Sequence, residues 1–121
     1  MTPPVFKALR GASPAFLLAG ALLPSGLQAA GNDAAPSLER RQALISLVRN
    51  DCGSCHGLTL KGGLGPALLP ETLAGKDRAM LSETILRGRN GTAMPPWSAF
   101  LDAAEAGWIV QQLQQGFPDA H

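Results

Sequence analysis

Both cysteines of this chain lie in one five-residue stretch, Cys52-Gly-Ser-Cys55-His56, which also contains one of its two histidines. On a helical turn, residues three and four apart share a face, so the two sulfurs and the imidazole would point the same way. The 121 residues include two Trp, four Phe and no Tyr, which is little ring material for a core. A group bound at this motif is therefore a candidate for the missing apolar bulk, and that requirement constrains the fold more than any other feature.

The first thirty residues differ in character from the rest of the chain. Lys7 and Arg10 are followed by a mostly small or apolar run, which Pro24 interrupts, and then by small residues. This order is typical of a secretory signal, and the apolar run is shorter than the roughly 20 residues that a spanning helix needs. A retained membrane anchor is the alternative. We predict a cleaved signal peptide (1–30), a linker (31–36), one small domain (37–117) and a tail (118–121).

The hydrophobic pattern predicts an all-α domain of three to four helices joined by long loops. Ser37 can cap a helix that runs to the cysteine motif. The apolar stripe of that helix contains Leu44 and Val48, whereas Arg40 and Arg41 lie off it. No segment alternates as a strand. Further helices are expected over residues 77–86 and 102–116, with a short turn at 70–74.

Four interpretations compete for the cysteine motif. A redox dithiol of the Cys-x-x-Cys type belongs in a βαβ setting, and this sequence shows no strands. A structural zinc site needs four ligands, and the whole supply of Cys and His is Cys52, Cys55, His56 and the terminal His121. A disulfide across so short a loop would stabilise little. We favour the fourth, one covalently attached haem, because Cys-x-x-Cys-His is its attachment pattern and the porphyrin would complete the core.

The second axial position of such a haem needs a ligand, and a soft, neutral thioether suits it. Met94 lies in a Gly-rich loop directly before Pro95 and Pro96, which push it into extended backbone and stiffen the segment. Met80 lies in the predicted helix over 77–86, where Met is more often core filler. We predict His56 and Met94 as the axial ligands. The alternative is a buried loop methionine with the iron left open.

These motifs resemble, in order and spacing, those of class I cytochromes c over roughly residues 38–115. The matching stretches are C52-G-S-C-H56, G65-P66-A-L68, L81-x-x-x-I85-x-x-G88 and M94-P95 before a closing helix. CGSCHGLTLKGGLGPAL and GTAMPPW are similar, more narrowly, to the small periplasmic cytochromes c-55X of denitrifying bacteria and to the haem-c domain of cytochrome cd-type nitrite reductase. One departure is Gln112, where the family often has an aromatic residue. Trp108 comes one turn earlier, which implies shifted packing of the first helix against the last.

The resemblance also implies roles for single residues. Pro66 is implied to give its carbonyl to the free N–H of His56, which would fix the imidazole tautomer. Trp97 would either donate its indole N–H to a haem propionate or pack on the ring edge. Arg87 and Arg89 flank the methionine loop and could pair with propionates, although exposed charges are usually solvated.

The function that the resemblance implies is single-electron transfer by a periplasmic, monomeric monohaem cytochrome that is not an enzyme. Its expected redox partner is nitrite reductase, and neither nucleic acid nor, after signal cleavage, a membrane is expected. The alternative is an accessory role in the maturation of nitrite reductase or of its special haem. Catalysis at an open iron would need Met94 to be absent or labile, and no distal His or Arg constellation supports it.

Overall fold

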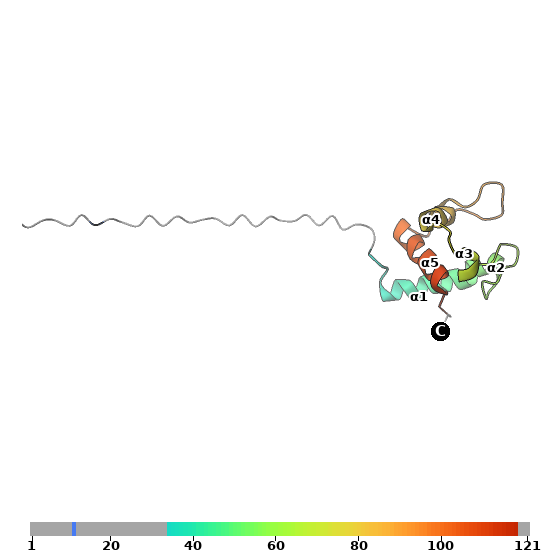
Figure 1. Ribbon diagram of the computed structural model, residues 1–121, viewed down its shortest axis with the longest axis horizontal. Helices are drawn as coiled ribbons and strands as arrows, with labels where there is room; N and C mark the ends of the chain where they lie inside the picture. Colours follow the sequence, from blue (N-terminus) through green and yellow to red (C-terminus); the bar gives the residue numbers. More distant parts are fainter. Residues whose placement is uncertain (1–10, 12–33, 119–121) are drawn as a thin grey trace, which may run out of the picture.

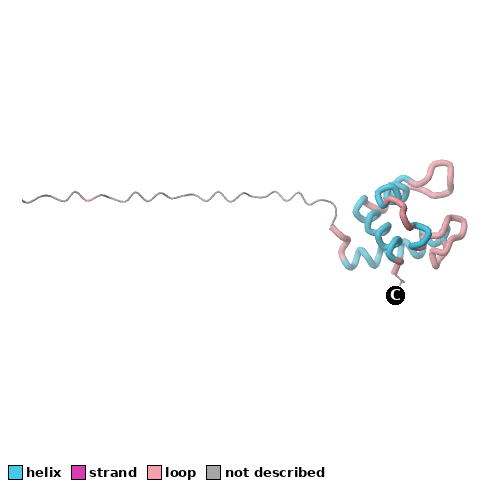
Figure 2. Tube along the Cα trace, in the orientation of Figure 1, coloured by secondary structure: helices cyan, strands magenta, loops and turns pink. Residues whose placement is uncertain are grey.

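The structure is a computed structural model that describes residue 11 and residues 34–118. The predicted signal peptide, apart from Gly11, and the last residues of the tail lie outside the described residues. Within residues 34–118 every regular element is a helix and none is a strand (Figures 1 and 2). The prediction of an all-α fold is therefore confirmed. In this described part, no helix is long and apolar enough to cross a membrane.

The first helical segment carries the cysteine motif at its end. It consists of α1 (Leu38–Leu47), the π-helical turn η1 (Val48–Cys52) and α2 (Gly53–His56) without a break. The Ser37 hydroxyl accepts the backbone N–H of Arg40 at 3.2 Å, as a capping residue does. In η1 the backbone N–H of Gly53 reaches the carbonyl of Val48, five residues back. The segment stops at Gly57, whose φ of +88° is a left-handed conformation.

The remaining helices begin and end close to the predicted residues. They are the single turn α3 (Pro70–Leu73), α4 (Arg78–Arg87) and α5 (Ala103–Gln115). Asp77 and Asp102 cap α4 and α5, and Glu105 completes a capping box at the start of α5. Gly88 and Gly116 follow their last residues.

Two long loops project from the same side of the domain, one after α2 and one after α4 (Figures 1 and 2). The first covers residues 57–69 and the second covers residues 88–102. The first loop begins directly after His56, the last residue of α2, and the second loop carries Met94.

The core is aliphatic, and α5 packs against α4 and α3 to form it. Among the described residues no aromatic side chain is fully buried; Trp97, Trp108 and Phe117 only pack at its margin. The fully buried cluster is Leu44, Val48, Leu60, Leu73, Leu101, Ile109 and Leu113. The low aromatic content of the sequence is thus also found in the buried cluster, which consists of Leu, Val and Ile.

Arg40 joins the start of the first helix to the start of the last. Its Nε donates to Glu105 Oε1 at 2.5 Å, and its Nη2 donates to the Phe100 carbonyl at 3.1 Å. The residues Arg40 and Glu105 are 65 positions apart, and no local pattern linked them.

Candidate cofactor site

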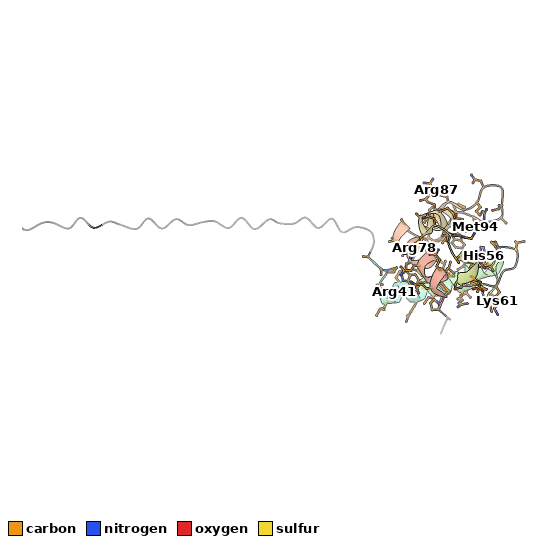
Figure 3. All side chains as sticks on the ribbon, in the orientation of Figure 1. Arg41, His56, Lys61, Arg78, Arg87 and Met94 are labelled. Carbon is orange, nitrogen blue, oxygen red and sulfur yellow. The ribbon has the colours of Figure 1, made fainter. Side chains whose placement is uncertain are left out.

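A cavity of about 350 Å³ lies between α2, the two long loops, α4 and α5. Most of its lining is aliphatic, supplied by residues such as Val48, Leu68, Ile85 and Leu113. Every predicted site residue lines it, namely Cys52, Cys55, His56, Pro66, Met94 and Trp97. Figure 3 shows His56 and Met94 near one another on the side where the loops project.

His56, the last residue of α2, is held in one orientation. Its Nδ1 lies 2.7 Å from the Pro66 carbonyl oxygen. A carbonyl can only accept, so Nδ1 carries the proton and Nε2 keeps the lone pair that a metal needs. Gly65 lies against the same ring, because a Cβ there would come 2.7 Å from Cε1 and 2.8 Å from Nδ1 of His56. The contact between His56 Nδ1 and the Pro66 carbonyl oxygen is the one that the resemblance implied for Pro66.

The loop after α2 is folded back onto the helix end that it leaves. The backbone N–H of Gly65 donates to the Cys55 carbonyl, and that of Gly62 donates to the His56 carbonyl, both at 2.8 Å. These bonds satisfy carbonyls that a helix C-terminus leaves without partners. They also bring Pro66 back to the imidazole.

The two cysteines are half-buried at the cavity wall and are not joined in a disulfide. Burial raises the pKa of the Cys52 thiol to about 11, and the nearby Asp51 carboxylate raises it further. A reactive redox dithiol works as a thiolate, which this environment disfavours at Cys52.

Met94 also lines the cavity and is half-buried, in a loop that packs against the end of α4. Gly88 has a φ of +70°, and a Cβ there would come 2.7 Å from the Met94 carbonyl oxygen. The Arg89 backbone N–H donates to that same oxygen at 3.2 Å. The Met94 N–H donates to the Thr92 hydroxyl at 3.3 Å. Thr92 was not among the residues that the sequence singled out, and Gly65 was named only as part of the G65-P66-A-L68 motif.

Met80 lies away from the cavity on α4 and is 50% exposed. Its interpretation as core filler is therefore wrong. The helix turns Leu81 and Ile85 toward the core and cavity instead, and the Met80 position faces solvent. The spacing of apolar residues predicted this helix correctly, but it did not show which face of the helix is turned toward the core.

The remaining predicted side chains differ in their surroundings. Arg87 forms an ion pair with Glu83 on the exposed surface of α4. Arg89 is exposed but lines the cavity. Trp97 is half-buried, with its ring centroid 6.0 Å from that of Phe100 and its backbone N–H bonded to a carbonyl of α4. Its role toward a propionate or a ring edge stays a prediction.

The donor set and the cavity fit a covalently held haem. Two cysteine side chains, an imidazole whose Nε2 keeps its lone pair and a thioether line one mainly aliphatic cavity in a helical domain. Within residues 34–118, its core contains no fully buried aromatic ring. This fold and this site define a monohaem c-type cytochrome.

Comparison with known proteins gives the family. Residues 30–112 match the family described as cytochrome c oxidase, cbb3-type, subunit III. Cytochrome c55X of Pseudomonas aeruginosa is 48% identical over 114 residues, which is 94% of each chain. Cytochrome c55X of Stutzerimonas stutzeri is 53% identical over 85 residues, 70% of this chain and 75% of that one. The solved c-type cytochrome NirC is similar with a TM-score of 0.66 and 54% identity, over 67% of this chain and 95% of that chain.

The chain belongs to this family of c-type cytochromes and, within it, to the cytochromes c55X. It carries one covalent haem c and is an electron carrier rather than an enzyme. A solved dihydro-haem d1 dehydrogenase, NirN, is also similar, with 42% identity and a TM-score of 0.55. That likeness covers 61% of this chain but only 16% of the dehydrogenase.

Proposed function

We propose that this cytochrome is a periplasmic carrier that delivers single electrons to nitrite reductase. In this proposal Cys52 and Cys55 would hold the haem through thioethers, and His56 and Met94 would coordinate its iron. The observation that carries the proposal is that all four side chains line one aliphatic cavity in a domain similar to cytochromes c55X. The similarity to haem-c domains of the nitrite reductase type, seen in the motifs, supports the choice of partner.

When bound, haem supplies a one-electron ferric–ferrous couple, and the chain sets the conditions under which it works. Pro66 fixes the tautomer of His56 and makes the imidazole a stronger donor. Met94 offers a neutral thioether, which favours the ferrous state. The aliphatic lining would offer water few polar partners beside the bound group. None of these residues changes its bonding partners in the proposed cycle, which suits rapid electron exchange.

The mouth of the cavity provides a contact surface for a partner. Leu64 lines the cavity and is nevertheless 82% exposed, and Leu58 on the same loop is 68% exposed. Lys61 lies between them in the sequence and is exposed (Figure 3). Exposed leucines on the loop that lines the cavity support contacts that form and dissociate readily.

Rapid mixing of the reduced protein with purified, oxidised nitrite reductase tests this function. A carrier should transfer electrons many times per second, at a rate that depends on ionic strength if charges steer docking. Leu64→Ser should slow transfer through weaker docking, whereas Leu38→Ser, an exposed leucine at the start of α1, is the matched control. A reductase that stays oxidised over minutes would contradict the proposal.

The second candidate is an accessory role in the maturation of nitrite reductase or its special haem. The similarity to dihydro-haem d1 dehydrogenase favours it: that enzyme of Pseudomonas aeruginosa is 42% identical over 73 residues, or 15% of its length. Deleting the protein separates the two roles. An accessory protein would leave the reductase without its special haem, whereas a carrier would leave the reductase complete but poorly supplied with electrons.

A further inference from the structure

We infer that Thr92 is a positioning residue whose hydroxyl holds Met94 at the cavity. The inference rests on the proposed function of Met94 as axial ligand. It concerns the loop after α4, whose turn at Gly91 lies in open space, since a Cβ there would meet no atom within 4 Å. The position of Met94 therefore depends on bonds made within the loop and at its base.

The hydroxyl of Thr92 joins the two sides of this loop. It donates to the Arg89 carbonyl at 2.8 Å and accepts the Met94 N–H at 3.3 Å. On the other side of Met94, its carbonyl accepts the Arg89 N–H at 3.2 Å. Both backbone polar groups of Met94 are thus tied to Arg89, one directly and one through the Thr92 hydroxyl.

The residues after Met94 offer few further restraints. Pro95 and Pro96 have no N–H and cannot donate a hydrogen bond. The next backbone anchor is the Trp97 N–H, which donates to the Ile85 carbonyl at 3.1 Å. The proline pair stiffens the segment, and its backbone packs against Gly88 at the end of α4. On the N-terminal side, the Thr92 bridge is the restraint that a side chain supplies.

Thr92 also lines the cavity, so its hydroxyl could act on the bound group instead. A threonine hydroxyl has one hydrogen to donate, and here the Arg89 carbonyl accepts it. Donation to a carboxylate of the bound group would require that bond to break. The hydrogen-bond count therefore favours a role in holding the loop.

The test uses purified holoprotein and imidazole as the competing ligand. Thr92→Val keeps the shape of the side chain but removes both hydrogen bonds, whereas Thr92→Ser keeps the hydroxyl. Thr84→Val is the matched control, because Thr84 also lines the cavity but its hydroxyl bonds back to the Met80 carbonyl within α4. Optical titration of the ferric forms measures how easily imidazole displaces the methionine, and thermal unfolding checks that each variant is folded.

For Thr92→Val we expect imidazole to bind about tenfold more tightly, a change of about 1.4 kcal/mol. Thr92→Ser and Thr84→Val should stay within about twofold of the parent, or about 0.4 kcal/mol. An unchanged Thr92→Val, or a Thr92→Ser that behaves like it, would overturn the inference. So would a Thr92→Val whose reduction potential shifts while its imidazole affinity does not, because the hydroxyl would then act on the bound group.

Met94→Ala separates this inference from the function on which it rests. If this variant binds imidazole no more tightly than the parent, Met94 is not the ligand and the positioning role of Thr92 fails. The electron-transfer measurement with nitrite reductase uses the parent protein, so its outcome is independent of the Thr92 series.

Discussion

Replacing Gly65 with alanine should disturb the histidine of the site through a single added methyl group. The new Cβ would lie 2.7 Å from Cε1, 2.8 Å from Nδ1 and 3.2 Å from Nε2 of His56. Unstrained carbon contacts are about 3.5–4.0 Å, so the ring or the loop must move by about 1 Å. The neighbouring Pro66 carbonyl, 2.7 Å from Nδ1, is carried on the same loop and cannot keep its hydrogen bond through such a shift.

The cost has two parts. Overpacking of a filled site costs about 1–3 kcal/mol, and losing the hydrogen bond between His56 and Pro66 costs about 1 kcal/mol more. A total of about 2–4 kcal/mol is a large fraction of the roughly 5–15 kcal/mol that stabilise a small domain. For a domain of this size each kcal/mol lowers the melting temperature by about 4–8 °C, so we expect a fall of at least about 8 °C.

Thermal unfolding of the ferric holoprotein, followed by circular dichroism, measures this fall. Gly107→Ala is the control: Gly107 lies within α5 with nothing within 4 Å of its added Cβ, so alanine should stabilise by up to about 1 kcal/mol. The reduction potential of Gly65→Ala should also rise, because an imidazole without its acceptor is a weaker donor to ferric iron. A Gly65→Ala protein that melts within about 2 °C of the parent, with an unchanged potential, would refute the steric reasoning.

Three further results are expected. Mass spectrometry of protein matured in the periplasm should show one added haem and the loss of about the first thirty residues; a bare polypeptide mass with two free thiols would contradict the attachment. Met94→Ala should abolish the weak ferric absorption band of a sulfur–iron bond and lower the potential, whereas Met80→Leu, at an exposed position, should change neither. The guanidinium of Arg40 lowers the pKa of Glu105 from its usual range, so the stabilisation by this pair is present above the unfolded carboxyl pKa of about 4.3 and is lost as pH falls through the folded value. Glu105→Gln should therefore melt earlier than the parent at pH 7, with a difference that shrinks in acid; parallel pH profiles of melting would oppose it.

The helix boundaries could be predicted because the residues that set them act locally. Asp77 and Asp102 accept backbone N–H groups three residues on, and Gly88 and Gly116 adopt left-handed conformations at the ends. Each of these effects depends on the residue type and on its immediate neighbours. The chain could therefore be divided into helices without knowledge of how they pack.

The rotation of α4 about its own axis and the pairing of residues far apart in the sequence could not be predicted in this way. Met80 and Leu81 are adjacent, and which of them faces the core depends on how α4 packs against α5. The π-helical turn before the motif depends on where the helix must point after Val48, a tertiary requirement with no local signal. The pairing of Arg40 with Glu105 likewise exists only once the first and last helices are packed.

The lining of the site and the buried core share residues. Five of the seven residues in the buried cluster also line the cavity, namely Val48, Leu73, Leu101, Ile109 and Leu113. One face of the core is therefore also the wall of the cavity, where a bound group would add the apolar contacts that the scarcity of aromatic residues leaves to it. The chemistry-bearing residues could be found from the sequence because their types and spacing are fixed by what they bind. Gly65 and Thr92 could not, because they act on the shape of the backbone around those residues, and that shape exists only when both loops close over the same cavity.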